Sequence, residues 1–355
     1  MPTTTPTHWI LDWDSTITTH DTLTPLVHIS ASSPSRTPSQ KQHILQEWNR
    51  ISKAYVDDFQ NTLGKWKDER GESTGTGDGG GGGGLAREKE MLRVLEDVEE
   101  RSLKRVCEAR ILAGLKADEV KWGAESVVRS GEVRVRKGFG EFWARLSSLA
   151  TEREDVSAGG QEKEEDVGLT ILSVNWSRLF ISSCLASSRP PITFPTASII
   201  SNELEGLVSS HSDTTTTANF TTGSILSTYT HHPNAPPLIL SSRHKLAIFE
   251  SLLSTADTST NKKKRKRVIY IGDSPTDLEC LLAADIGICM RDQDGEGEGG
   301  GGKLAETLAR GGVRCVRLRD LEGEGGDRGA GGGGKVVTWV RDFEEVNVWL
   351  DGRRD

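Results

Sequence analysis

The sequence has no hydrophobic segment long enough to cross a membrane, since no apolar run approaches the ~18 residues that a spanning helix needs. Its first residues also lack the basic and apolar regions of a secretory signal. The five cysteines are odd in number and form no C-x-x-C pair, which argues against a disulfide framework and a zinc site. We therefore expect a cytoplasmic protein in a reducing setting, with no membrane partner.

Basic charge is scarce in this chain. The 44 Lys and Arg residues are outnumbered by 52 Asp and Glu residues, so the net charge is −8 at pH 7. An acidic chain argues against general nucleic-acid binding, and no nucleic-acid partner is expected. A run of six basic residues at 262–267 is the exception. We favour a solvated loop there, and a nuclear localisation signal is the open alternative.

Glycine, by contrast, is abundant and unevenly spread. The tracts at 71–84, 295–302 and 323–334 hold nine, six and eight of the 39 glycines. Such composition is typical of flexible insertions, so we expect flexible glycine-rich loops at these places. The length of 355 residues suggests about two domains at roughly 150 residues each.

Short apolar segments alternate with stretches of helical period in most of the chain. A long part without an apolar strand segment, from about 40 to 128, shows only helical spacing. Strands that alternate with helices predict an α/β fold with a doubly wound parallel sheet. Active sites of such sheets lie at the carboxyl ends of the strands. The predicted strands are 8–11, 169–172, 197–200, 268–271, 286–289 and 313–318.

Polar side chains follow three of these strands directly. Asp12 and Asp14 come after the first strand, Ser173 after the second, and Asp273 with Asp277 after the fourth. Paired carboxylates at the end of a buried strand are costly to desolvate without a cation or hydrogen-bond donors. Oxygen ligands of this kind suit Mg²⁺, which shares its coordination shell with substrate phosphate and water.

These residues resemble the four motifs of the haloacid dehalogenase (HAD) superfamily, and the segment 201–204 with Gly223 is similar to its phosphoserine-phosphatase-like branch. The resemblance covers residues 8–20 and about 135–320. It implies a Rossmann-like core with a parallel sheet from 1–20 and 135–355, and a helical C1 cap from 21–134. The motif residues are Asp12-x-Asp14-x-Thr16, Ser173, Lys245 and Gly272-Asp273-x-x-x-Asp277.

The resemblance also implies a reaction and a cofactor. Asp12 would attack phosphorus to form an aspartyl-phosphate, and Asp14 would act as general acid and then as general base. Mg²⁺ would be held by Asp12, by the backbone carbonyl of Asp14 and by Asp273, with Asp277 binding directly or through water.

The remaining motif residues are expected around the phosphate. Ser173 and Lys245 would bind phosphoryl oxygens, and Thr16 would order the loop beside them. In phosphoserine phosphatases a glutamate after the first motif holds the substrate ammonium, and Asp21 occupies that position here.

The implied function is hydrolysis of a small phosphorylated metabolite by a Mg²⁺-dependent phosphatase. Asp14 favours phosphatases over dehalogenases, because a dehalogenase has no alkoxide leaving group that needs a proton. Two alternatives stay open, namely a phosphotransferase of the same chemistry and a non-catalytic regulatory protein. Simpler roles also exist, since Asp12 and Asp14 could form a turn and Asp273 and Asp277 could cap a helix.

Overall fold

A computed structural model of the chain describes residues 7–69, 84–154, 168–207, 220–230, 235–257, 266–292, 302–321 and 336–352. The three glycine tracts and the basic run at 262–267 therefore lie almost wholly outside the described residues, and the expectation of a nuclear signal gains no support. No helix in the described ranges has the length and apolar character to cross a membrane.

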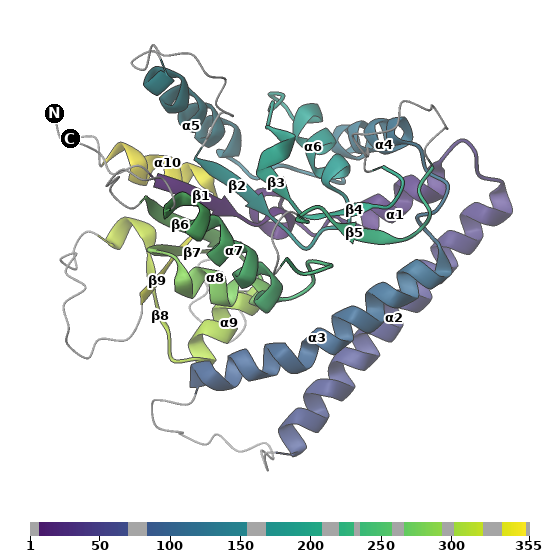
Figure 1. Cartoon of the computed structure of the whole chain (residues 1–355), viewed down its shortest axis with the longest axis horizontal. Helices are drawn as coiled ribbons and strands as arrows, with labels where there is room; N and C mark the ends of the chain where they lie inside the picture. Colours follow the sequence, from purple (N-terminus) through teal and green to yellow (C-terminus); the bar gives the residue numbers. More distant parts are fainter. Residues whose placement is uncertain are drawn as a thin grey trace.

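A seven-stranded parallel sheet lies between helices in the core of the molecule (Figure 1). Its strand order is β3-β2-β1-β6-β7-β9-β8. The α/β prediction with a Rossmann-like parallel sheet is therefore confirmed. The strands are β1 (Thr7–Leu11), β2 (Leu169–Leu172), β3 (Ile199–Ile200), β6 (Arg267–Gly272), β7 (Ile286–Met290), β8 (Arg314–Arg317) and β9 (Val336–Val340).

Strand β1 lies between β2 and β6 in the sheet. Leu11 is in register with Ile171 on one side and Ile271 on the other. The residues that follow these three strands therefore emerge side by side. The sheet differs from the prediction chiefly at β9, which was not predicted, and at the third strand, which is shortened to Ile199–Ile200 because Thr196–Ser198 form a 3-10 turn.

Two layers of helices cover the two faces of the sheet, as the alternation of side chains along β1 requires. Trp9 and Leu11 pack in one apolar cluster with residues of α5 (Phe139–Glu154), α6 (Arg178–Ser187) and α10 (Phe343–Asp351). Ile10 points the other way. It packs in a second cluster with residues of α7 (Ser242–Asp257), α8 (Leu278–Ala283) and α9 (Gly302–Arg310).

A helical insertion separates β1 from β2 and consists of α1 (Leu23–Ser32), α2 (Pro38–Asp68), α3 (Gly84–Ala109) and α4 (Ala117–Ser130). The two long helices α2 and α3 run antiparallel along one side of the sheet domain, and the start of α3 lies beside α9 (Figure 1). Helix α2 begins with a capping box between Thr37 and Gln40. Helix α1 begins at Leu23, directly after a threonine-rich segment.

A small antiparallel ribbon, β4 (Asn202–Leu204) and β5 (Ile225–Ser227), was not predicted as strands. The segment before β5 bonds to the connection between α3 and α4, where the Thr221 backbone N–H donates to the Leu115 carbonyl oxygen at 2.9 Å. The ribbon thus ties the insertion to the chain that follows β3.

Candidate active site

The predicted site residues meet at the carboxyl edge of the sheet. Asp12 follows β1, Ser173 follows β2 and Asp273 follows β6, while Lys245 lies in the first turn of α7. Asp277 ends the 3-10 turn Pro275–Asp277 just before α8. Carboxylate oxygens of Asp12, Asp273 and Asp277 all lie within 4.8 Å of one another. The structure therefore brings together residues that are up to 265 positions apart in the sequence.

Asp12 is almost completely buried at this edge. Its Oδ1 accepts a hydrogen bond from the Trp13 backbone N–H at 2.7 Å, and its Oδ2 lies 2.9 Å from Lys245 Nζ. Burial and the charges of Asp277 and Asp273 raise the pKa of the Asp12 carboxyl well above its ordinary value, although Lys245 acts against them. The site therefore holds more negative charge than one lysine offsets.

Asp277 is a fully buried acceptor at the centre of the site. Its Oδ1 accepts from Lys245 Nζ and from the Tyr270 hydroxyl, both at 2.7 Å. Its Oδ2 accepts from the backbone N–H groups of Asp273 and Ser274 and from the Ser274 hydroxyl, at 3.1–3.2 Å. A carboxylate offers about four lone-pair positions, so these donors occupy its acceptor capacity. Asp277 is thus better suited to hold Lys245 and to reach a cation through water than to bind it directly.

The close approach of Asp277 depends on Gly272. A Cβ atom at residue 272 would lie 2.4 Å from Asp277 Cγ, which is closer than van der Waals contact allows. Any larger residue at position 272 would therefore collide with Asp277, which explains the glycine before Asp273.

Asp273 stands beside the loop that follows β1. Its Oδ1 accepts a hydrogen bond from the Thr16 hydroxyl at 2.7 Å. Burial, followed by the charge of Asp277, raises the pKa of the Asp273 carboxyl to about 7, and the Thr16 hydrogen bond opposes this rise. Thr16 was predicted to order the phosphate-site loop, and in the structure its hydroxyl is engaged with Asp273.

Asp14 has a separate set of partners. Its Oδ1 accepts from the Thr22 backbone N–H at 2.8 Å and the Thr22 hydroxyl at 2.6 Å, and its Oδ2 accepts from Asn175 Nδ2 at 2.9 Å. Burial and then the charge of Asp21 raise the pKa of the Asp14 carboxyl to about 7, against the effect of these hydrogen bonds. A carboxyl group with such a pKa can both give and take a proton near neutral pH.

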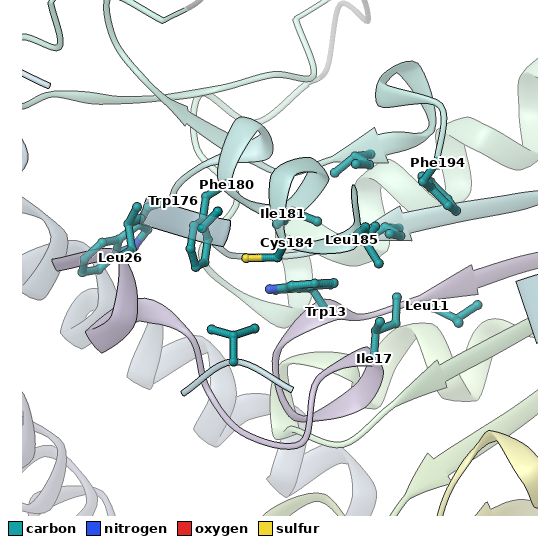
Figure 2. Packing of buried hydrophobic residues seen from close by; sticks show 14 of the residues in the cluster. Leu11, Trp13, Ile17, Leu26, Trp176, Phe180, Ile181, Cys184, Leu185 and Phe194 are labelled. Carbon is teal, nitrogen blue, oxygen red and sulfur yellow. The ribbon is translucent and has the colours of Figure 1, made fainter. Parts of the chain in front are cut away.

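The ring of Trp13, which lies between Asp12 and Asp14 in the sequence, packs in the apolar core. Figure 2 shows it beneath α6 with Cys184 above it, and the indole is fully buried. Its Nε1 donates to the Thr22 hydroxyl at 3.1 Å. The ring therefore fixes the threonine that in turn holds Asp14.

Two further predicted residues lie at the border of this cluster. Ser173 is fully buried, and its hydroxyl accepts a hydrogen bond from the Asn175 backbone N–H at 3.1 Å. Asp21 is exposed, and its Oδ1 accepts from the Leu23 backbone N–H at 2.9 Å at the start of α1. Burial and the neighbouring Glu99 raise the pKa of Tyr55 on α2, and the charge of Asp21 raises it further.

Arg136 is a site residue that the sequence reasoning missed. The guanidinium is almost buried and donates to the carbonyl oxygens of Ser15 at 2.6 Å and Thr16 at 3.1 Å. It also donates to Asp292 Oδ1 at 2.7 Å. It fixes the loop after Asp12 from 120 positions away. An isolated arginine that belongs to no motif or periodic pattern cannot be recognised as a site residue from one sequence.

Asn202 and Glu203 form hydrogen bonds with the segment that follows β2. Asn202 Nδ2 donates to the Val174 carbonyl oxygen at 3.0 Å, and Glu203 accepts from the Ser177 hydroxyl at 2.6 Å. Both contacts hold the segment that carries Ser173 and Asn175.

The parallel sheet with acidic residues at its carboxyl edge agrees with the Rossmann-like core that the sequence predicts. No family model matches the chain. A CTO1 family protein of the fission yeast Schizosaccharomyces pombe is 27% identical over 283 residues, which cover 80% of this chain and 81% of that protein.

Solved structures of similar fold were also found. One is a phospho-aspartyl intermediate analogue of phosphoserine phosphatase, with 12% identity, a TM-score of 0.40 and coverage of 97% of this chain and 99% of that chain. Another is a phosphoserine phosphohydrolase-like protein from Francisella tularensis subsp. tularensis, with 14% identity, a TM-score of 0.43 and the same coverage.

Proposed function

We propose that this protein is a Mg²⁺-dependent phosphatase that hydrolyses a small phosphomonoester through an aspartyl-phosphate on Asp12. The observation that supports this proposal is the arrangement of Asp12 between a lysine and two further carboxylates, with Asp14 two residues away. A nucleophile, an acid–base group and a cation-binding set thus lie at one sheet edge.

The donor set fits Mg²⁺. Asp12, Asp273 and Asp277 supply hard oxygen ligands, and their single ammonium partner leaves negative charge uncompensated. Asp12 and Asp273 would bind the ion directly, and Asp277 through water. When bound, Mg²⁺ offsets the charge of the phosphoryl group and of the carboxylate that attacks it.

The reaction then follows from the residues. An oxygen of Asp12 attacks phosphorus, and the bond to the leaving oxygen breaks as Asp14 donates its proton to that oxygen. In the second step Asp14 takes a proton from water. The water oxygen attacks phosphorus, and the bond to Asp12 breaks to release phosphate. Ser173 and Lys245 hold the phosphoryl oxygens and offset charge in both steps.

The helical insertion would serve as a C1 cap over the leaving group, as the sequence resemblance implies. Near Asp21, the Tyr55 hydroxyl donates to Glu99 Oε1 at 2.8 Å across α2 and α3. Burial raises the pKa of the Glu99 carboxyl, and the Tyr55 hydrogen bond and the charge of Lys303 oppose this rise. The pKa of the Asp21 carboxyl is also raised, and the charge of Lys303 acts against that rise as well. Acceptors of this kind favour a small metabolite whose leaving group carries hydroxyl or ammonium donors.

Phosphate release from a panel of small phosphomonoesters tests the proposal. We expect release in Mg²⁺, none in EDTA, and none from Asp12→Asn. The exposed Asp118→Asn on α4 is a matched control that should behave like the wild type. Transfer of phosphate to an added alcohol would instead identify a phosphotransferase. A folded, Mg²⁺-binding protein that releases no phosphate from any ester would favour a regulatory role and contradict the proposal.

A further inference from the structure

Helix α3 of the insertion contacts the helix that carries Lys245. The carboxylate of Glu96 on α3 accepts hydrogen bonds from Arg243 Nη2 and, at 3.3 Å, from Arg243 Nε. His244 Nε2 lies 3.5 Å from the same carboxylate. Glu96 is only 7% exposed. The contact joins residues that are more than a hundred positions apart in the sequence. A buried acid of the insertion therefore binds the two residues that precede Lys245.

Hydrogen bonds within the first turn of α7 connect Arg243 and His244 to Lys245. The Leu240 backbone N–H donates to His244 Nδ1 at 3.3 Å, so the imidazole proton lies on Nε2 and faces Glu96. The backbone N–H groups of His244 and Lys245 both donate to Ser241, at 3.3 Å and 3.0 Å. The start of α7 also carries the positive end of the helix dipole, which stabilises a carboxylate placed there.

Electrostatics keep Glu96 ionised in this position. Burial opposes its charge, but hydrogen bonds from Arg243 and Ser241 outweigh burial and lower the pKa of the carboxyl. Lys245 itself is fully buried and has little freedom, with Nζ at 2.9 Å from Asp12 and 2.7 Å from Asp277. A small displacement of the turn would lengthen both contacts.

We infer that Glu96 is a positioning residue, which fixes the first turn of α7 and thereby holds Lys245 Nζ between Asp12 and Asp277. Docking of the insertion and the geometry of the phosphate site are then coupled through one carboxylate. The part of this inference that concerns turnover rests on the proposed phosphatase function, whereas the position of Lys245 does not.

Helix α3 offers a matched control in Glu88. This carboxylate is also buried, and it accepts hydrogen bonds from Arg310 Nε at 2.9 Å and Nη2 at 3.0 Å. Arg310 ends α9 and does not belong to the turn that carries Lys245. Glu88→Gln therefore weakens a similar contact between α3 and the sheet domain without altering α7.

Chemical labelling of Lys245 tests the inference without any substrate. The full-length wild type, Glu96→Gln and Glu88→Gln are treated with acetic anhydride, and acetylation of Lys245 is followed by peptide mass spectrometry. We expect labelling to be about tenfold faster in Glu96→Gln, roughly the effect of one lost charge-assisted hydrogen bond on a local opening equilibrium. In Glu88→Gln the rate should stay within about twofold of the wild type by the same reasoning. Unchanged labelling in Glu96→Gln, or an equal rise in both variants, would overturn the inference.

Kinetics add a second readout once a substrate is found. We expect kcat of Glu96→Gln to fall about tenfold with KM nearly unchanged, because Lys245 offsets charge that develops in the transition state. Glu88→Gln should keep the wild-type kcat. If the wild type releases no phosphate, the proposed function fails, and the labelling experiment still decides the role of Glu96.

Discussion

Replacement of Lys245 with methionine would leave Asp12 and Asp277 buried without their ammonium. Nζ lies 2.9 Å and 2.7 Å from their oxygens, and all three side chains are nearly or fully buried. At an effective dielectric constant of about 20, each contact corresponds to roughly 6 kcal/mol of gross attraction. Desolvation of the ammonium offsets much of this energy. Loss of one partner of a buried ion pair costs about 3–5 kcal/mol, and we expect Lys245→Met to lower the free energy of unfolding by that amount at pH 8.

The pH dependence of this loss has a definite sign. The folded-state pKa of Lys245 is raised, so the ammonium stays protonated in the folded and unfolded states between pH 5 and pH 8 and its own titration adds no pH dependence there. The pKa of Asp12 is already raised in the folded state, and removal of Lys245 raises it further. A carboxyl group with a raised folded pKa costs stability as the pH climbs above its unfolded pKa of about 3.9. The destabilisation by Lys245→Met should therefore grow from pH 5 to pH 8.

Urea unfolding at both pH values, in EDTA so that no divalent cation replaces the ammonium, measures these free energies. The double variant Lys245→Met/Asp12→Asn supplies the decisive comparison. It should recover about 1–2 kcal/mol relative to Lys245→Met at pH 8, which corresponds to roughly one pKa unit of relieved charge burial, and less at pH 5. A loss that is greater at pH 5 than at pH 8, or no recovery in the double variant, would refute the reasoning.

Other substitutions test the site by independent routes. Gly272→Ala should displace Asp277, lower the free energy of unfolding by about 1–3 kcal/mol and abolish phosphate release. At Gly64 in α2 an added Cβ atom would have no neighbour within 4 Å. Gly64→Ala should therefore raise the free energy of unfolding by about 0.5–1 kcal/mol in the same urea assay. Mg²⁺ at a hundred times its Kd should stabilise the protein by about 2.7 kcal/mol in thermal unfolding, and a shift that persists in Asp273→Asn would place the ion elsewhere. Arg136→Met should free the loop after the nucleophile, which faster amide hydrogen exchange there and slower phosphate release would report; unchanged exchange would contradict it.

The carboxyl edge of the sheet could be predicted because it depends on local patterns. Each short apolar run marks a strand, and parallel strands in register end at the same edge. Asp12, Ser173 and Asp273 follow such runs directly, so their proximity was expected from the sequence. Lys245 was harder to place, since Arg243 and His244 adjoin it and a lysine at the start of a helix is common.

Other features depend on contacts that no local pattern records. Helix α1 contains Pro25 and follows a threonine-rich segment, so its sequence favours a loop, yet Leu26 and Val27 are fully buried in the core. Strand β9 does carry a local signal, because Val336–Val340 is rich in β-branched and aromatic residues. Arg136 has none, since its function as a clamp exists only once the loop after Asp12 has folded against it.

The geometry also supports the proposal that a cation stabilises this site as well as serving its chemistry. Burial is the largest factor that raises the pKa of Asp12, Asp14 and Asp273, so the fold places carboxylates where their charged forms are disfavoured. Lys245 compensates part of that charge, and Arg136 fixes the loop without contacting the carboxylates. What remains uncompensated is the charge that a divalent cation would neutralise. The proposed reactivity of the site and its cost to the folded state therefore have the same physical origin.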